Sequence, residues 1–170
     1  MVGRSSLSSN QGFRVARYLE LLRRSVGDSE FGYRVQGMFA NVLVQVGWRV
    51  VEIKPQGHPD IIARQGEREM LVEVEFVPGF RRRYSVKQDD LDGTRPRTSH
   101  CAGYLALLDL APPASWLLID SNVLRGRGTG TLPMVTLRAF SKRSFSRECS
   151  DEFASIVTGH ESELHNLSFH

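Results

Sequence analysis

The sequence predicts an α/β domain in which two helices precede a group of short strands. Apolar residues recur at helical spacing before residue 47, and short apolar or alternating runs follow between residues 48 and 120. A chain of 170 residues, of which 41% are hydrophobic, is long enough to bury a core. The sequence therefore indicates a single domain in which helices flank a sheet.

The first two elements are predicted to be helices. The segment Phe13–Ser25 carries its apolar residues at intervals of three and four, which places them on one helical face. Gly27 is expected to end this helix. Asp28 or Ser29 can then cap a second helix that runs to Gly47.

Three strands are predicted next, and the last two form a hairpin. The segments are Trp48–Ile53, Asp60–Arg64 and Glu69–Phe76. Because the turn between the second and the third is short, these two strands should pair antiparallel.

The remaining elements depend on shorter signals. A loop is expected around the glycines of residues 126–130. The other predictions are a helix that opens over Ser85–Leu91, strands at Gly103–Leu108, Trp116–Asp120 and Met134–Leu137, and a helix at Asp151–Val157.

The charge of the chain is unevenly distributed. The formal net charge is +3, but all 22 Lys and Arg precede residue 148, together with 14 of the 19 acidic residues. Residues 1–147 therefore carry about +8, which would attract a polyanion such as nucleic acid. An ordinary arginine-rich solvated surface has the same composition. Residues 148–170 are interpreted as an acidic extension packed on or near the domain, and the Ser-rich residues 1–11 as a disordered leader.

The sequence points to neither a membrane nor an oxidising compartment. No apolar run approaches the ~20 residues needed to cross a bilayer, and the first residues lack the apolar stretch of a secretory signal. The two cysteines, Cys101 and Cys149, are interpreted as incidental thiols. We therefore expect a cytoplasmic protein.

The predicted strand Glu69–Phe76 carries the acids on which a function depends. Alternate residues from Met70 onward are apolar and share one face, so Glu73 and Glu75 point together to the other. The hairpin brings Asp60 alongside Glu73, where neighbouring negative charges resist ionisation unless a divalent cation neutralises them. Mg²⁺ prefers such oxygen ligands. The alternative is an exposed hairpin with ordinary surface acids.

Pro59-Asp60, followed after twelve intervening residues by Glu73-Val74-Glu75, resembles the motif of the PD-(D/E)xK nuclease superfamily. The order of elements over about residues 28–120 is similar to that of archaeal Holliday-junction resolvases and their restriction-enzyme-like relatives. The resemblance implies a restriction-endonuclease-like fold, with a central mixed β-sheet flanked by helices and an α-β-β-β-α-β core. It assigns residues 12–147 to an endonuclease-like domain.

The resemblance also implies a site and a reaction. By position, Asp60 and Glu73 would ligate Mg²⁺ or Mn²⁺, with the Val74 carbonyl as a candidate further ligand. The cation would acidify a bound water and stabilise charge on the attacked phosphate. Lys87 and Gln88 stand where the family often places polar residues on its second helix. The expected partners are duplex or branched DNA and a second copy of the chain, because cutting a duplex needs two sites.

Two positions depart from the family pattern. Glu75 occupies the position of the family's lysine, where a glutamate can act as a general base or outer metal contact. Lys54 or Lys87 is a candidate for the displaced positive charge. The family's resolvases also carry an acid in the helix that precedes the first strand. The corresponding region of this chain contains Gln36 instead. Glu30, further upstream, is the weaker candidate, and an acid there also suits the start of a helix.

Several basic residues are candidates for contacting nucleic acid. Arg81, Arg82 and Arg83 follow the third predicted strand in a loop beside the site, where they would either hold phosphates or form a solvated charge run. His58 precedes Pro59 and could touch the site, but its main interpretation is a loop histidine. The other nucleic-acid-binding candidates are Lys54, Lys87, Arg125 and Arg127.

The sequence leads to two main hypotheses. The first is a Mg²⁺- or Mn²⁺-dependent DNA endonuclease with Asp60, Glu73 and Glu75 as its acidic centre. The second is a catalytically inactive nucleic-acid-binding or assembly module on the same fold, motivated by Glu75 and the missing helix acid. A nuclease acting on RNA or single strands is a third hypothesis.

Overall fold

The computed structural model describes residues 9–54 and 57–167 and begins with two helices. Helix α1 spans Ser9–Val26 and helix α2 spans Asp28–Gln45. The predicted start of the first helix at Phe13 is therefore wrong, and the predicted leader of residues 1–11 overlaps the first turn of α1. Residues 1–8 of that leader lie outside the described residues.

The chain reverses between α1 and α2 at a single glycine. Gly27 is the N-cap of α2 and has a φ of 84°, a left-handed conformation that glycine adopts without steric cost. The predicted cap at Asp28 or Ser29 is wrong, because both residues already lie within the helix.

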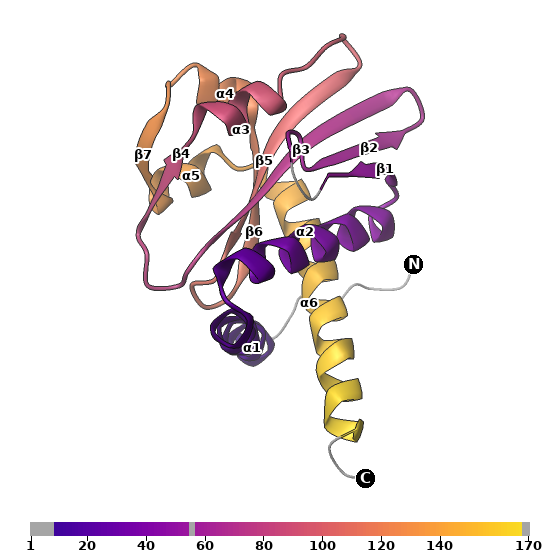
Figure 1. Cartoon of the computed structure of the whole chain (residues 1–170), viewed down its shortest axis with the longest axis vertical. Coiled ribbons are helices and arrows are strands. Elements are labelled where there is room, and N and C mark those ends of the chain that lie inside the picture. The colour runs from indigo at the N-terminus through magenta and orange to yellow at the C-terminus, as the bar shows by residue number, and fades with distance from the viewer. Residues whose placement is uncertain (1–8, 55–56, 168–170) are drawn as a thin grey trace.

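A mixed five-stranded sheet forms the centre of the molecule, with strand order β1-β2-β3-β5-β6 (Figure 1). The first three strands pair antiparallel, β3 and β5 pair parallel, and β5 and β6 pair antiparallel. A parallel pair needs a crossover, which here includes helix α3. The predicted mixed sheet is thus confirmed. The strands are β1 (Arg49–Ile53), β2 (Ile61–Gln65), β3 (Arg68–Val77), β5 (Cys101–Asp109) and β6 (Ser115–Asp120).

A second, two-stranded sheet joins segments that are far apart in the chain. Strand β4 (Arg83–Val86) pairs antiparallel with β7 (Gly130–Pro133). The predicted helix over Ser85–Leu91 is therefore wrong at its start. Ser85 belongs to a strand whose alternate residues are buried, and helix α3 spans Gln88–Gly93.

The predicted strand at Met134–Leu137 is also wrong. These residues begin helix α5 (Met134–Phe140), and both Met134 and Leu137 are buried because residues three apart share a helical face. A further helix that the sequence analysis did not predict, α4 (Ser121–Arg125), follows β6.

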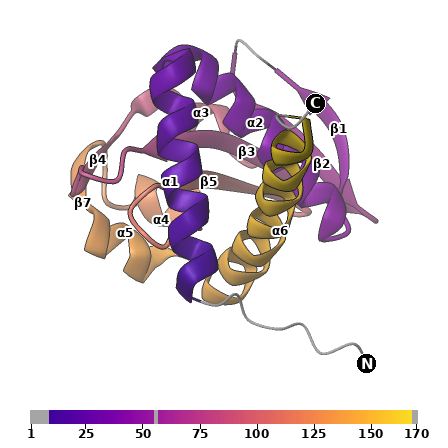
Figure 2. The same ribbon diagram turned by 90° about the horizontal axis from the view of Figure 1, so that it is seen from below.

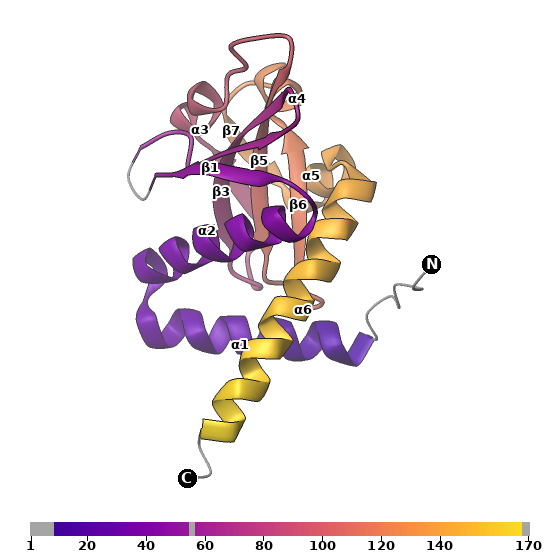
Figure 3. The ribbon, with the colours of Figure 1, turned by 90° about the vertical axis from the view of Figure 1, so that its right-hand side faces the viewer.

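The large sheet is covered on both faces, which gives three layers (Figures 1 and 3). Helices α1, α2 and α6 (Arg143–Leu167) pack on one face around a core that includes Leu19, Phe39 and Trp116. The β4–β7 pair and helices α3, α4 and α5 cover the other face around Leu105 and Leu117. Figure 2 shows α1 and α6 together on the first of these faces.

Helix α6 runs through the boundary predicted between residues 147 and 148. Phe153 and Val157 of this helix lie beyond that boundary, and both are buried in the core. The hydroxyls of Ser146 and Ser150 accept hydrogen bonds from backbone N–H groups of the edge strand β6 at 3.0 and 2.9 Å. The first turns of the acidic extension are therefore continuous with the domain, and α6 then continues past the sheet (Figure 3).

The two cysteines are both buried and unpaired. Burial raises the pKa of the Cys149 thiol to about 12, which suits the predicted incidental role. Within residues 9–54 and 57–167, none of the helices combines the length and apolar character that a membrane span requires.

Candidate metal centre

Strand β3 is buried on both faces, so its central acid is not a surface residue. Val72 and Val74 enter the core beneath α2, and Glu73 on the opposite face is only 3% exposed. The predicted alternation is confirmed, but the alternative of an exposed hairpin with surface acids is wrong for Glu73. The physical reason is tertiary, because the crossover after β3 returns over this face and covers it.

Asp60 lies beside Glu73, as the hairpin predicts. Ile61, the first residue of β2, pairs with Val72, so Asp60 directly precedes the strand pair at the end where Glu73 lies. Asp60 is 6% exposed, and its hydrogen bonds connect α2 to β3. Its Oδ1 accepts a hydrogen bond from Gln36 Nε2 on α2 at 2.9 Å, and its Oδ2 accepts one from the backbone N–H of Val74 at 2.8 Å.

His58 contacts Glu73 directly. Its Nδ1 lies 2.6 Å from Glu73 Oε1, so the interpretation of His58 as a loop histidine is incomplete. The other carboxylate oxygen, Glu73 Oε2, is buried and has no hydrogen-bond partner among the described residues. A buried carboxylate oxygen without a partner is costly, which makes Glu73 the most informative side chain of the site.

Asp90 completes the cluster, and the sequence analysis did not anticipate it. His58, Glu73 and Asp90 each offer one ligand atom, and these atoms all lie within 4.8 Å of one another. Asp90 is the third residue of α3, and its Oδ2 accepts from the backbone N–H of Lys87 at 3.4 Å. An acid at the third helical position commonly bonds back to the cap, and this signal could have located it.

The electrostatics of the cluster favour a cation. Burial, together with the nearby carboxylates of Asp60, Asp90 and Glu75, raises the pKa of Glu73 to about 9. Burial also raises the pKa of Asp60 to about 6, although the Val74 N–H opposes the shift. A divalent cation would remove the repulsion and fill the position facing Glu73 Oε2. The residues present therefore fit such an ion.

Glu75, the residue at the family's lysine position, is paired with a lysine from another element. Lys87 Nζ lies 2.7 Å from Glu75 Oε1, and this contact raises the pKa of Lys87. The other candidate for the displaced charge, Lys54, lies 3.7 Å from Glu52 at the end of β1. Gln88 is exposed at the start of α3. Of the two lysines, Lys87 is therefore the one that the fold brings to the acids.

A cleft of about 450 Å³ opens between α2 and β3 beside these acids. Gln36, Asp60, Glu73 and Lys87 are among the side chains that line it. Glu30 does not line this cleft and instead forms an ion pair with Arg34 at 2.9 Å on the surface of α2. The structure thus brings Gln36, rather than Glu30, to Asp60.

The arginine loop lies next to the acidic cleft. Arg81 and Arg83 line a cavity of about 260 Å³ together with Glu75 and Lys87. Arg82 faces an adjoining groove that also contains Arg138. The loop therefore presents positive charge within reach of the acidic residues.

The other two arginine candidates are held by local contacts on α4 and the turn after it. Arg125 donates hydrogen bonds to the Leu91 carbonyl and to Asn122 Oδ1. The Arg127 guanidinium lies 5.1 Å from the centre of the Phe140 ring. Neither residue lines the acidic cleft.

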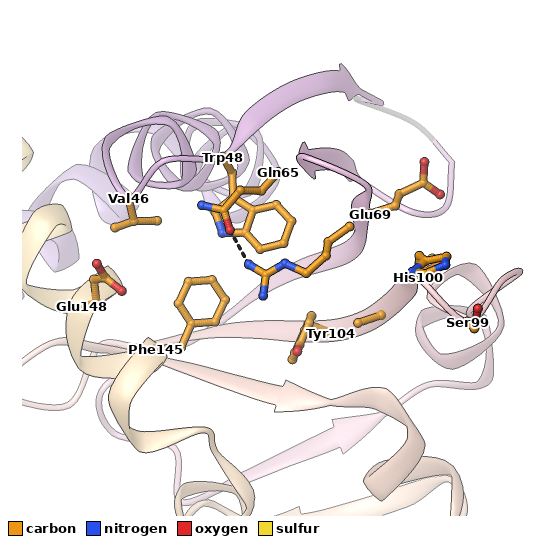
Figure 4. Close-up of a pocket in the computed structure, with 12 residues that line it drawn as sticks. Val46, Trp48, Gln65, Glu69, Ser99, His100, Tyr104, Phe145 and Glu148 are labelled. Carbon is orange, nitrogen blue, oxygen red and sulfur yellow. Dashed lines mark hydrogen bonds between the residues drawn. The ribbon is translucent and has the colours of Figure 1, made fainter.

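A larger pocket of about 630 Å³ lies where β3 and β5 begin (Figure 4). Trp48, Tyr104 and Phe145 supply its aromatic walls. The Arg68 guanidinium lies 5.2 Å from the centre of the Trp48 ring and donates a hydrogen bond to Gln65 Oε1. Its lining includes none of the acids that meet at Glu73.

The central mixed sheet, its flanking helices and the order of the elements form a fold of the kind that the resemblance implies. Among solved structures, the chain is similar to Hjc, a Holliday junction resolvase from the archaeal hyperthermophile Archaeoglobus fulgidus. The sequences are 18% identical, the TM-score is 0.52, and the match covers 65% of this chain and 88% of that one. Neither a known family nor any curated protein matches the sequence.

Proposed function

We propose that this chain is a divalent-metal-dependent DNA endonuclease that hydrolyses phosphodiester bonds in duplex or branched DNA. The observation that carries the proposal is Glu73, a buried acid with one oxygen that has no hydrogen-bond partner among the described residues. It lies beside Asp60 on the strand pair where the family holds its metal. The fold shared with a Holliday junction resolvase supports it.

In this proposal Glu73 and Asp60 bind the cation, and the Val74 carbonyl is a further candidate ligand. When bound, Mg²⁺ or Mn²⁺ supplies positive charge that acidifies water and stabilises the phosphate under attack. Gln36 and the Val74 N–H hold the Asp60 carboxylate in place through their hydrogen bonds. Orienting contacts of this kind support metal sites.

Glu75 and Lys87 act together in the proposed site. Lys87 stands in for the family's lysine by placing its ammonium group 2.7 Å from Glu75, at the edge of the acidic cleft. Arg81 and Arg83 are proposed to hold DNA phosphates beside this pair. The ammonium and guanidinium groups would offset the repulsion between DNA and the acids.

The first prediction concerns cleavage. A four-way DNA junction and a supercoiled plasmid are incubated with the protein and Mn²⁺, and products are resolved on gels. Asp60→Asn and Glu73→Gln should each lower the rate to about one hundredth or less, and EDTA should abolish it. Glu67→Gln, in the exposed turn between β2 and β3, is the matched control and should cut like the parent. Unchanged cleavage by Asp60→Asn or Glu73→Gln would disprove this site.

A second candidate function is an inactive DNA-binding or assembly module. Glu75 at the family's lysine position and the neutral Gln36 beside Asp60 favour it, because neither residue type matches the family's active set. Such a module would bind DNA with an affinity that falls steeply with salt, yet would cut neither substrate with Mg²⁺ or Mn²⁺.

We also propose that two copies of the chain pair, since cutting both strands of a duplex requires two sites. Light scattering should then report about twice the mass of the 19.2 kDa chain. A mass equal to one chain at the concentrations used for cleavage would contradict the pairing.

A further inference from the structure

Three side chains from separate segments converge at one point beside β3. His58 lies in the loop before β2, Glu73 in the middle of β3, and Asp90 in α3. They offer one imidazole nitrogen and two carboxylate oxygens, all within 4.8 Å of one another. We infer that His58 and Asp90 are metal ligands together with Glu73, and that this nitrogen-containing site binds Mn²⁺, Co²⁺ or Zn²⁺ in preference to Mg²⁺. The inference deepens the proposed function, and rests on it only for the use of the ion in cleavage.

Glu73 distinguishes this site from an ordinary cluster of acids. The residue is 3% exposed, so little water solvates its carboxylate. His58 Nδ1 satisfies Oε1 at 2.6 Å, but Oε2 has no hydrogen-bond partner in the part of the chain that the structure describes. A cation is the ligand that both suits this oxygen and tolerates the neighbouring carboxylates.

Asp90 is held in the manner of a supported metal ligand. Tyr84 Oη donates to its Oδ2 at 3.2 Å, and the backbone N–H of Lys87 donates to the same oxygen at 3.4 Å. Among the described residues, both hydrogen bonds to the Asp90 carboxylate use its Oδ2 atom. Its Oδ1 atom is therefore left for an ion. Metal-ligating carboxylates are commonly oriented by outer hydrogen bonds of this kind.

The position of His58 is fixed by close packing against the end of α3. A Cβ atom added at Gly93 would lie 2.3 Å from the Cβ of His58, so only glycine allows the helix to approach this closely. The contact places His58 between α3 and β3, and therefore between the residues that carry Asp90 and Glu73.

The presence of an imidazole determines the class of cation. Mg²⁺ prefers oxygen ligands and retains several waters. Imidazole suits transition metals such as Zn²⁺, and affinity for a nitrogen-containing site rises from Mn²⁺ to Co²⁺. Family-like ligation by Asp60, Glu73 and a carbonyl would use oxygen alone. Recruitment of His58 therefore moves the preference of this site away from Mg²⁺ and toward Mn²⁺, Co²⁺ or Zn²⁺.

The test measures Mn²⁺ binding by the full chain, without DNA, by electron paramagnetic resonance and calorimetry. His58→Ala and Asp90→Asn should each weaken binding about tenfold or more. The matched controls are His100→Ala, an exposed histidine before β5, and Asp89→Asn, the exposed neighbour of Asp90. Both controls should bind Mn²⁺ as the parent does. Thermal melting in EDTA checks that all four variants fold.

Pulsed electron paramagnetic resonance of Mn²⁺ bound to the parent protein tests the inference without any variant. The parent should show magnetic coupling to an imidazole nitrogen, and a tenfold excess of Mg²⁺ over Mn²⁺ should leave most of the Mn²⁺ bound. Absence of the nitrogen coupling, or ready displacement by equimolar Mg²⁺, would overturn the inference.

The failure of this inference and the failure of the proposed function are distinguishable. Nitrogen-coupled Mn²⁺ that depends on His58, in a protein that cuts no DNA, would support the inference and reject the nuclease. Cleavage that depends on Asp60 and Glu73, by a protein whose Mn²⁺ affinity is unaffected by His58→Ala and Asp90→Asn, would reject the inference and support the nuclease.

Discussion

At the scale of single residues, Glu73 is the side chain that folding alone explains least well. Hydrophobic residues surround β3, and a valine or leucine at this position would bury apolar surface without an unpartnered oxygen. The chain instead places an acid there and surrounds it with Asp60, Asp90 and Glu75. An arrangement that opposes stability is typical of a functional site.

The acids give a prediction for the pH dependence of stability in the metal-free protein. The pKa of Glu73 in the folded state, about 9, exceeds its ordinary value of 4.5, so the folded protein retains a proton that the unfolded chain releases. The favourable contribution of the protonated acid is complete below about pH 4.5 and is lost as the pH rises toward about 9. Asp60, with a pKa of about 6, acts in the same direction.

Urea denaturation in EDTA at about pH 5 and about pH 9 tests this prediction. The free energy of unfolding of the parent should fall more between these values than that of Glu73→Gln, which cannot ionise. Equal changes in the two proteins would mean that Glu73 titrates normally.

At the scale of elements, the site depends on the close approach of the crossover segment to β5. A Cβ atom added at Gly103 would lie 1.7 Å from the carbonyl oxygen of Thr94 and 2.6 Å from Ser121 Oγ. The absence of a side chain at Gly103 therefore lets the end of α3 and the start of α4 pack on the sheet. This contact positions the segment that carries Asp90.

Gly103→Ala should destabilise the protein by about 1–3 kcal/mol or more, because the overlap involves backbone that cannot move alone. Gly37→Ala is the matched control. It lies inside α2, where no atom of the described residues comes within 4 Å of the added Cβ, and should stabilise the protein by up to ~1 kcal/mol. Urea denaturation measures the free energy of unfolding of both variants. A Gly103→Ala variant as stable as the parent would contradict the close approach.

The prediction of elements from the sequence succeeded where the signal was local. The hairpin of β2 and β3 follows from an alternating pattern and a short turn, so Asp60 and Glu73 could be placed together in advance. The prediction was wrong at Ser85, which pairs with β7, and at Met134, where the chain leaves β7 and begins α5. Residues 83–86 alternate polar and apolar side chains over only four positions, and residues 130–133 do not alternate, so each segment depends on its partner to form a strand.

At the scale of the whole molecule, the fold depends on the segment beyond the predicted nuclease domain. Phe153 is 1% exposed on α6 and packs edge-to-face against Trp116 of β6, with ring centres 5.5 Å apart. The same helix bonds to the backbone of β6 through Ser146 and Ser150. Helix α6 therefore covers an edge strand that would otherwise be open to pairing.

Phe153→Ala should destabilise the protein by about 3–5 kcal/mol, through lost burial and the cavity left behind. Ser155→Ala, on the exposed side of the same helix, should change stability by less than about 0.5 kcal/mol. Thermal and urea denaturation provide the comparison. If the two substitutions had equal effects, α6 would not be part of the folding unit.

The sequence by itself determined the α/β class and the adjacency of Asp60 to Glu73, because periodicity and a short turn act over a few residues. The tertiary structure alone decided which other groups surround Glu73. His58 and Asp90 reach it from a loop and from a crossover helix, and of the two candidate lysines only Lys87 reaches Glu75. Contacts between segments distant in the chain depend on how the layers pack, and no local pattern in the sequence specifies that packing.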